Sequence, residues 1–335
     1  MPANLYTFQM TPEQNERLVA ELAGGNYVPR KVPYTVAAAE APSWGCNVAL
    51  YTSGKCVVQG KGAKDFIENV MEPVVLREIV LSQDGSGELA PPPLTDEAKS
   101  PHIGVDESGK GDYLGPLVIA AVYTDETLSE ALRAAGAQDS KAVASDRQAL
   151  QIAERLRSIL GPKRYSVVLI GNPAYNRLYA RMRSVNRILS WAHAKAIGNV
   201  LDGVPDCPMA ISDQFGTGDD VRRALRDQGR TIELRSRPKA ESDVAVGAAS
   251  LLAREAFLHA IAALQEQYGG EFPKGATHVR GAAESLVRAH GPKILLNAAK
   301  AHFRTTDQVL AATGHTRLEL PPEGQVISVP FKGNK

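Results

Sequence analysis

The segment that decides the fold reads HIGVDESGKGDYLGPLVIAAV and spans residues 102–122. Its first apolar run ends in two adjacent acids, Asp106 and Glu107, and a glycine-rich turn that carries Lys110 follows. Two carboxylates at a strand end, beside a turn whose glycines let a ligand approach the backbone, favour a metal-dependent site for a phosphate-bearing substrate. Adjacent residues of a regular strand point to opposite faces, so we expect this strand to end at the acids and bend at Ser108-Gly109.

The same segment also matches a nucleotide-binding P-loop, because Gly104 to Lys110 has the spacing G-x-x-x-x-G-K. A P-loop presents backbone N–H groups and a Ser or Thr hydroxyl to phosphates and magnesium. Here Gly111 stands at the hydroxyl position, and Asp106 and Glu107 inside the loop would repel phosphate. These residues argue against a P-loop.

Length and composition limit the class of protein. With 335 residues, 44% of them hydrophobic, the chain can bury a sizeable core and is expected to form two domains. No apolar run approaches the roughly 18 residues of a membrane span, and the first residues lack a signal-peptide core. We therefore expect a cytoplasmic protein with no membrane segment. The formal net charge of +1 gives no sign of a polyanionic partner for the chain as a whole.

The candidate metal ligands are oxygens. The three cysteines, Cys46, Cys56 and Cys207, are scattered and form no C-x-x-C pair, which suits a reducing compartment and argues against a cysteine-based zinc site. The seven histidines show no H-x-x-x-H spacing. Any metal is therefore expected to be a hard ion held by oxygen.

Composition divides the chain into four segments. We predict a small α+β unit at 1–85, a linker at 86–101, an α/β domain at 102–312 and a tail at 313–335. Turn-forming residues and three consecutive prolines mark the linker. The polar stretch 305–335 is expected to be loosely attached.

The N-terminal unit is expected to hold a helix, a short antiparallel sheet and a closing helix. The first helix begins with Thr11-Pro12-Glu13, an N-cap followed by proline and an acid, and runs to about Leu22. Ser53-Gly54-Lys55 is the predicted turn between the last two strands. The strands and the closing helix are predicted at 34–41, 47–52, 56–60 and 63–74.

Five apolar runs predict the strands of the second domain. We expect the first three to meet at hairpin distance, and helices separate the later ones and fill 240–303. This order implies an α/β domain with a five-stranded mixed sheet and flanking helices. The predicted strands are 102–106, 115–123, 165–171, 209–213 and 231–235.

Two further acids follow elements of this domain. Asp213 closes the apolar strand 209–213, and Glu241 precedes a helix rich in alanine and glycine. For each acid taken alone, a solvated strand end or a helix start is the better explanation, since acids near helix starts are common. Together with Asp106 and Glu107 they favour a shared metal site, and the residue pattern leaves both explanations open.

Two stretches concentrate basic residues. Residues 162–195 carry seven Lys or Arg and no acid, and 274–304 carry six against the single acid Glu284. A solvated helix face is the simplest explanation. A face without counter-charges would instead fit a channel for a nucleic-acid backbone. In the first stretch, a helix capped by Asn172-Pro173 is expected to align its arginines largely along one side. These arginines are Arg177, Arg181, Arg183 and Arg187.

These motifs, in this order, resemble the type 2 ribonucleases H, and within that group bacterial ribonuclease HIII. The resemblance covers the chain to about residue 312, and its most specific element is Asp-Glu-Ser-Gly-Lys-Gly-Asp-Tyr-Leu-Gly-Pro-Leu at 106–117, although Leu114 stands where the family more often has Phe. The supporting elements are 139–141, 176–193, 213–215, 239–241 and 300–303.

The resemblance implies an RNase H-like fold and endonucleolytic cleavage of the RNA strand in RNA·DNA hybrids, by a monomer. The family's four catalytic and metal-binding acids correspond to Asp106, Glu107, Asp213 and Glu241, and a Glu at position 241 is typical of HIII. The expected cofactors are two Mg²⁺ ions, or Mn²⁺, with Asp106 bridging them. One ion would activate the attacking water and the other would stabilise the departing oxygen, leaving 5′-phosphate and 3′-hydroxyl ends.

The resemblance also implies substrate contacts. The family's glycine-rich turn reads the 2′-hydroxyl side of the cut nucleotide. The N-terminal unit resembles the TATA-binding-protein-like domain of HIII enzymes and is expected to hold the hybrid, although seven basic and eight acidic residues in 1–80 leave it nearly neutral. The predicted substrate-binding residues are Ser108, Gly109, Lys110, Gly111, Lys141 and Arg183.

Two other functions remain open at this stage. A Holliday-junction resolvase would also use clustered acids, but it would not explain the Gly109-Lys110-Gly111 turn or the N-terminal unit. A non-catalytic binding module would use the N-terminal sheet, and the presence of all four acids argues against it.

Overall fold

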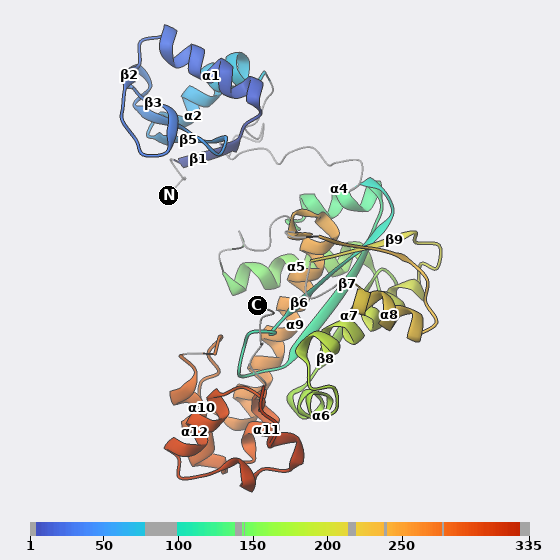
Figure 1. The fold of residues 1–335 in the computed structure, drawn as a ribbon. Coiled ribbons are helices and arrows are strands. Elements are labelled where there is room, and N and C mark those ends of the chain that lie inside the picture. The colour runs from blue at the N-terminus through green and yellow to red at the C-terminus, as the bar shows by residue number, and fades with distance from the viewer. Residues whose placement is uncertain are drawn as a thin grey trace, which may run out of the picture. The chain divides into compact units, whose positions relative to one another are not determined.

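The computed structural model describes residues 5–77, 99–137, 143, 145–213, 219–237, 240–276 and 278–328 (Figure 1). The side chains of Asp213, Asp219, Arg237 and Glu241 also lie outside what it describes. The chain divides into two compact units, Met1–Pro93 and Leu94–Lys335. The predicted boundary at residue 85 and most of the predicted linker fall in 78–98, outside the described residues.

The second unit is built around a five-stranded mixed sheet, as the sequence predicts. Its strand order is β10-β9-β6-β7-β8. β6 pairs antiparallel with β7 and β7 with β8, whereas β6 and β9, and β9 and β10, run parallel. The strands are β6 His102–Ser108, β7 Leu117–Thr124, β8 Tyr165–Ile170, β9 Met209–Asp213 and β10 Glu233–Arg237.

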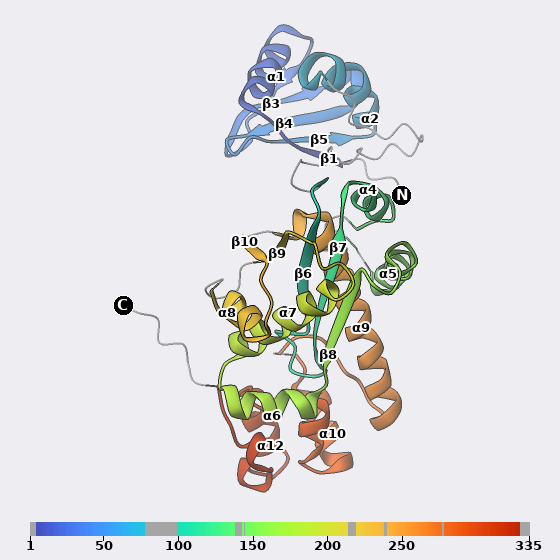
Figure 2. The same ribbon diagram turned by 90° about the vertical axis from the view of Figure 1, so that its right-hand side faces the viewer.

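Helices cover both faces of this sheet (Figure 2). Ile103, Val105 and Ile119 pack against one group, α6, α7 and α8, while Val118 and Ala120 pack against the other, α4, α5 and α9. Alternate residues of each strand are thus buried on opposite faces. The helices are α4 Glu126–Ala134, α5 Asp146–Leu160, α6 Asn172–Met182, α7 Val185–Leu201, α8 Asp219–Asp227 and α9 Val244–Tyr268.

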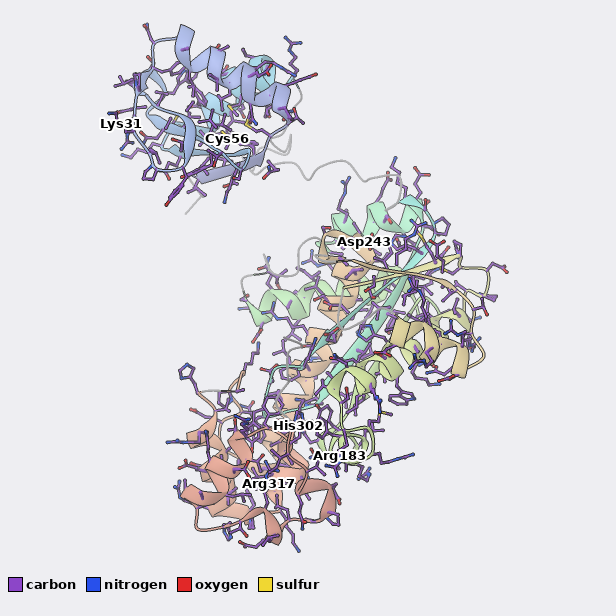
Figure 3. The ribbon with its side chains drawn as sticks, in the orientation of Figure 1. Lys31, Cys56, Arg183, Asp243, His302 and Arg317 are labelled. Carbon is purple, nitrogen blue, oxygen red and sulfur yellow. The ribbon has the colours of Figure 1, made fainter. Side chains whose placement is uncertain are left out.

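Helix α9 is the central element of its layer. Asp243 caps it by accepting hydrogen bonds from the amides of Ala245 and Val246, and the same Oδ1 lies 3.1 Å from Nε2 of the buried His102 at the start of β6. This contact, at the labelled Asp243 in Figure 3, ties the start of the helix to the start of the strand. Although α9 is long and apolar enough to cross a membrane, most of it is buried inside this unit, as in a core helix.

The C-terminal helices form a separate core layer at one end of the sheet. Tyr113 and Leu114, which follow the glycine-rich turn, are fully buried among α10 Arg280–His290, α11 Ile294–Ala298 and α12 Thr305–Ala312. The expectation of a loosely attached stretch from residue 305 is wrong for 305–328. Val309 and Leu320 are buried, and Arg317 donates hydrogen bonds to several carbonyl groups of the chain around it. One arginine with five donors anchors this stretch, a feature that a polar composition conceals.

The N-terminal unit is an antiparallel five-stranded sheet in the order β1-β5-β4-β3-β2. Helix α1 Pro12–Gly24 and the helical segment that follows β5 pack on it. The predicted strands, capped first helix and hairpin turn are present, and Gly54 in that turn has φ 78°. The sequence interpretation missed two edge strands. One, β2, has only two residues, too few to show an alternating pattern, whereas the other, β1, has the usual length of a strand. The strands are β1 Leu5–Gln9, β2 Val28–Pro29, β3 Thr35–Ala41, β4 Cys46–Tyr51 and β5 Lys55–Gly60. The closing segment is a short helix α2 Ala63–Phe66 that continues as the π-helix η2 Ile67–Leu76.

The close packing of α9 on β6 predicts that Gly104 cannot be enlarged. A methyl group at Gly104 would lie 2.2 Å from backbone atoms of Ala245 and Val246. We expect Gly104→Ala to lower the free energy of unfolding by about 2 kcal/mol or more, because overpacking of a dense core typically costs about 1–3 kcal/mol. Urea unfolding measures this loss.

The matched control is Gly281→Ala on α10, where no heavy atom lies within 4 Å of the added methyl group. This variant should be neutral or slightly stabilised, since alanine favours a helix over glycine. Equal unfolding free energies for the two variants would contradict the close packing of β6 and α9.

Candidate active site

Strand β6 carries Asp106 and Glu107 without a bend between them. The antiparallel register with β7 continues through Asp106–Ala120 and Glu107–Ile119 to Ser108. The strand therefore runs one residue past the acids, contrary to the expectation that it ends at them, and the predicted bend falls at Gly109, where φ is 87°. In a regular strand the two side chains point to opposite faces, and the contacts described next fit this.

Asp106 lies on the face covered by α9. It is partly buried and accepts a hydrogen bond from Ser250 of that helix. Removal from water, followed by the nearby negative charge of Glu107, raises the pKa of Asp106 to about 6, against the lowering influence of Ser250 and His193. Asp106 is thus a carboxyl group whose negative charge is poorly compensated by the protein.

Glu107 lies on the face covered by α7. Its Oε2 is 3.1 Å from Nε2 of the fully buried His193, and its Oε1 is 3.5 Å from Nζ of Lys110. Burial alone would raise the pKa of Glu107, but the hydrogen bond and charge of His193, with the charge of Lys110, hold it below its ordinary value. The adjacent acids therefore have opposite pKa shifts.

His193 is a site residue to which the sequence interpretation gave no role. It lies within the resembling segment 176–193, but no local pattern sets it apart from a core histidine. Only the packing of α7 on β6 brings it to Glu107, 86 residues away in the chain.

The other two predicted acids follow neighbouring parallel strands. Val105 of β6 is in register with Ser212 of β9, so Asp106 and Asp213 each come next on adjacent strands, whose backbones are about 4.8 Å apart. Glu241 lies in the short 3₁₀ helix η3 Ala240–Ser242, where Ala240 packs with Ile211 of β9 and Val246 of α9. All four positions thus lie along one part of the sheet, on parallel strands β6 and β9 and the connection that leads from β10 into α9.

The glycine-rich turn leaves β6 next to this region. Gly109 has φ 87°, and a side chain there would meet the carbonyl oxygen of Pro116 at 2.3 Å, so only glycine fits. At Gly111, by contrast, an added methyl group would meet nothing within 4 Å. Lys110 between them is 42% exposed. The turn therefore exposes backbone groups and the charged side chain of Lys110 next to Asp106 and Glu107.

Comparison with known proteins identifies this arrangement. The family model for ribonuclease HII matches residues 103–306. Ribonuclease HIII of Chlamydia abortus is 36% identical over 308 residues, which cover 91% of this chain and 97% of that protein. Ribonuclease HIII of Chlamydia trachomatis serovar L2 is 37% identical over 315 residues, or 93% and 99% of the two chains. The chain belongs to the ribonuclease HIII group.

Solved structures agree with this assignment. Bst-RNase HIII in complex with Mn²⁺ is similar, with a TM-score of 0.62 and 29% identity over 92% of this chain and 99% of that one. The predicted RNase H-like fold is therefore confirmed, and the chain is a ribonuclease H. Enzymes of this family depend on divalent metal and cleave RNA in RNA–DNA hybrids.

The side chains fit a divalent cation by their chemistry. The partly buried, hydrogen-bonded Asp106 has a raised pKa and carries a charge that a cation would neutralise, and carboxylate oxygen is the ligand preferred by Mg²⁺ and Mn²⁺. Among the side chains that the structure describes, no group of three or more His, Cys, Asp or Glu is arranged to hold a metal. Asp213 and Glu241 are outside that set, so their role as ligands stays a prediction.

Two of the predicted substrate-binding residues, Lys141 and Arg183, are not part of the turn in the sequence. Lys141 lies outside the described residues. Arg183 is exposed, adopts φ 55° at the end of α6, and donates to the carbonyl of Ala180 (Figure 3). The predicted continuous arginine-bearing helix is wrong, because α6 ends at Met182 and Arg187 belongs to α7. Asn172 does not cap α6 either, because Gly171 is the N-cap. The side-chain amide of Asn172 donates instead to the carbonyl of Gly115.

The basic stretch 274–304 is not free of counter-charges in this ribonuclease HIII, contrary to the sequence interpretation. Arg280 and Arg288 both pair with Glu284, and Lys274 pairs with Asp146 of α5. Lys300 is fully buried. The partner of Lys274 is 128 residues away in the chain, so a count of charges within the stretch cannot find it.

The raised pKa of Asp106 predicts a cost in stability without metal. The folded protein binds this proton more tightly than the unfolded chain, with a pKa of about 6 against 3.8, so this contribution to stability is lost as pH rises through 6. We expect Asp106→Asn, which stays neutral, to be more stable than the metal-free native protein at pH 7.5, by about 1–3 kcal/mol. Urea unfolding in chelator measures the difference.

The advantage of the variant should shrink towards pH 4, where Asp106 is protonated in the folded state and the pH approaches its unfolded pKa of 3.8. Mn²⁺ should stabilise the native protein more than the variant, because the ion binds the folded state. A stability difference that does not change between pH 4 and 7.5 would contradict the assignment of an uncompensated charge to Asp106.

Proposed function

We propose that this chain is an endonuclease that cuts the RNA strand of RNA·DNA hybrids by phosphodiester hydrolysis, leaving 5′-phosphate and 3′-hydroxyl ends. The observation that carries the proposal is the pair Asp106 and Glu107, partly buried at the end of β6 beside the glycine-rich turn, in a chain that belongs to the ribonuclease HIII group. Asp213 and Glu241 are the other two proposed ligands, for two Mg²⁺ or Mn²⁺ ions.

Each acid has a separate role in this proposal. Asp106, between the sheet and α9, would supply the oxygens shared by both ions. Glu107 is kept ionised and oriented by His193, so it is ready to accept a cation at neutral pH. When bound, the ions supply an activated water and stabilise the departing 3′-oxygen.

The turn is the proposed contact for the scissile nucleotide. Ser108 to Gly111 would bring backbone groups close to the ribose, where the 2′-hydroxyl distinguishes RNA from DNA. Lys110, within reach of Glu107 and partly exposed, would bind the adjacent phosphate. Lys141 and Arg183 are proposed as further phosphate contacts along the strand.

The N-terminal unit is proposed to hold the hybrid. Its sheet exposes Tyr34 and Val36 at one end of β3, with Arg30 nearby in the chain, a mixture of apolar and basic groups that suits a nucleic-acid backbone and sugars. We further propose a monomer in the cytoplasm. The three cysteines are free and buried, which is compatible with a reducing compartment.

Removing the carboxylate of Asp106 should separate binding from chemistry. We expect Asp106→Asn to lower cleavage of a labelled RNA·DNA hybrid by at least about 10³-fold, as loss of a metal-bridging ligand removes several kcal/mol of transition-state stabilisation. Hybrid binding with metal present should remain within a few-fold of native. Cleavage is measured with Mg²⁺, with Mn²⁺ and with chelator.

Matched duplex DNA and four-way junction substrates are the controls for the alternative nuclease function. Native protein should cut neither. Cleavage of the junction, or full activity of the Asp106→Asn variant on the hybrid, would rule out the proposed function.

Deleting residues 1–85 should weaken substrate affinity and spare the chemistry. We expect KM for the hybrid to rise at least about tenfold with kcat changed less, because lost binding that is uniform between ground and transition states appears in KM. Steady-state kinetics measure both. If the isolated N-terminal unit were the whole working part, the deletion would abolish binding and the remaining chain would have no nuclease activity.

A further inference from the structure

The glycine-rich turn does not hold its own shape. Between the end of β6 and the start of β7, residues 109–116 contain three glycines, which give an isolated chain many conformations. A hydrogen bond of 3.3 Å from the amide of Asp112 to the carbonyl of Gly109 lies within the turn, and the short bonds around it come from elsewhere. The conformation of the turn is therefore set by the residues that contact it.

Lys300 makes the most direct of these contacts. Its side chain is fully buried, and its Nζ donates to the carbonyls of Asp112 at 2.8 Å and Gly115 at 2.7 Å. Its backbone amide donates to the carbonyl of Tyr113 at 2.8 Å. One residue thus binds three carbonyl groups within four consecutive residues of the turn.

Neighbouring groups complete this clamp. The side-chain amide of Asn172 donates to the same Gly115 carbonyl at 2.8 Å, and the backbone amide of Gly115 donates to the carbonyl of Ala298. Asn176 in turn fixes the lysine's own segment, since it bonds to Ala299 and Ala301 on either side of Lys300. The clamp therefore joins α6, the segment after α11 and the turn.

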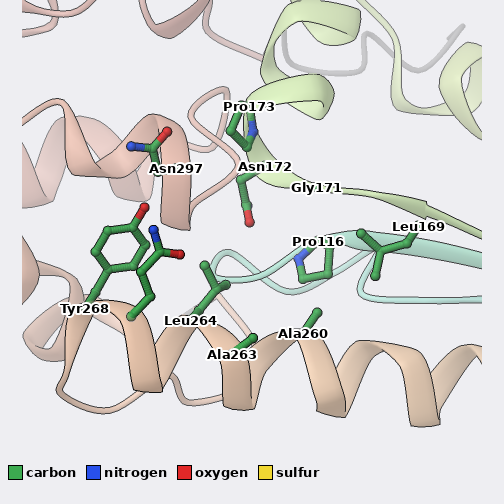
Figure 4. A pocket seen from close by; sticks show the side chains of 11 residues that line it. Pro116, Leu169, Gly171, Asn172, Pro173, Ala260, Ala263, Leu264, Tyr268 and Asn297 are labelled. Atoms are coloured by element: carbon green, nitrogen blue, oxygen red, sulfur yellow. The ribbon is translucent and has the colours of Figure 1, made fainter.

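Side-chain packing does not fix the far side of the turn. A cavity of about 380 Å³ lies beside Pro116, lined by Asn172, Leu264, Tyr268 and Asn297 (Figure 4). Core packing of Tyr113 and Leu114 holds one side of the turn, and on the side of this open space polar tethers hold the backbone.

A lysine is a costly choice for this position. Burial favours the neutral amine and lowers the pKa of Lys300 to about 7, with Asp112 acting in the opposite direction. An apolar residue of similar length would fill the same space without that cost. The donors of Lys300 supply what an apolar side chain lacks, namely bonds to two carbonyls of a flexible turn.

We propose that Lys300 is a positioning residue that holds the glycine-rich turn, and with it Lys110, in register with Asp106 and Glu107. This inference rests on the proposed function of the turn as the contact for the scissile nucleotide. Lys300 acts through the turn and does not itself touch substrate.

The test compares Lys300→Met, which keeps the length and loses the donors, with Arg317→Met. Arg317 belongs to the same helical layer and bonds to Asp307 and to the carbonyls of Ala301 and Phe303. Among the described hydrogen bonds, none joins Arg317 to residues 109–116. Both variants of the full chain are assayed on the hybrid, well below their unfolding temperatures, and hydrogen exchange is followed in the peptide covering 108–116.

We expect Lys300→Met to lower kcat at least about tenfold and to raise exchange in the turn at least about tenfold, the size of effect expected from the loss of two buried hydrogen bonds. Arg317→Met should lower the unfolding temperature and keep native kcat and native exchange in the turn. Native kcat in Lys300→Met, or the same loss of kcat and the same local exchange in Arg317→Met, would overturn the inference.

Further variants decide the matter if Lys300→Met does not fold. Lys300→Gln keeps a donor group, the side-chain NH₂, and Asn172→Ala removes the second bond to Gly115. Each variant should give a smaller loss of kcat and a smaller rise in exchange of the turn. Native kcat and native exchange in both variants would overturn the inference. If the native protein cleaves no hybrid, the proposed function fails. The exchange measurement still decides whether Lys300 holds the turn.

Discussion

The structure depends on the burial of negative charge at the end of β6. Asp106 is partly buried between the sheet and α9 and lies next to Glu107, where its ionised form is less favourable than in water. A protein selected for stability alone would not keep a carboxyl group there. A divalent cation bound at this site would compensate the negative charge, and the dependence of the family on divalent metal agrees with this.

The fold solves a geometric problem that adjacent acids create. Because Asp106 and Glu107 point to opposite faces of a regular strand, each is supported by a different helix, Asp106 by Ser250 of α9 and Glu107 by His193 of α7. The two layers thus give the acids different environments, and their pKa values move apart. His193 and Lys110 favour the ionised form of Glu107, whereas the ionised form of Asp106 is disfavoured by its surroundings and would be stabilised by a bound cation.

The sequence predicts the parts of this site that are local. The run of strand, acids and glycine turn is readable because hydrophobicity and chain reversal are encoded by neighbouring residues, and the five strands of the sheet follow from the same signals. The sequence could not assign roles to His193 or Lys300, since each becomes part of the site only when helices pack against β6 or the turn. The break between α6 and α7 was missed for a related reason, because Arg183 in a left-handed conformation is an uncommon way for a non-glycine residue to end a helix.

The errors concerning charge have one physical origin. Counting Lys and Arg along a stretch assumes that their partners are also local, yet Lys274 is neutralised by Asp146 from α5, and Lys300 is turned inward to bind carbonyls. What remains on the surface is a smaller basic area than the count implies, carried by exposed side chains such as Arg177, Arg181 and Arg187. Affinity for a polyanion is therefore expected to come from several separate contacts, with the turn at the centre, rather than from one continuous basic face. In such an arrangement the position of the turn matters more than the total charge, and a buried lysine that fixes the turn can influence cleavage more than an exposed lysine that adds one further attraction.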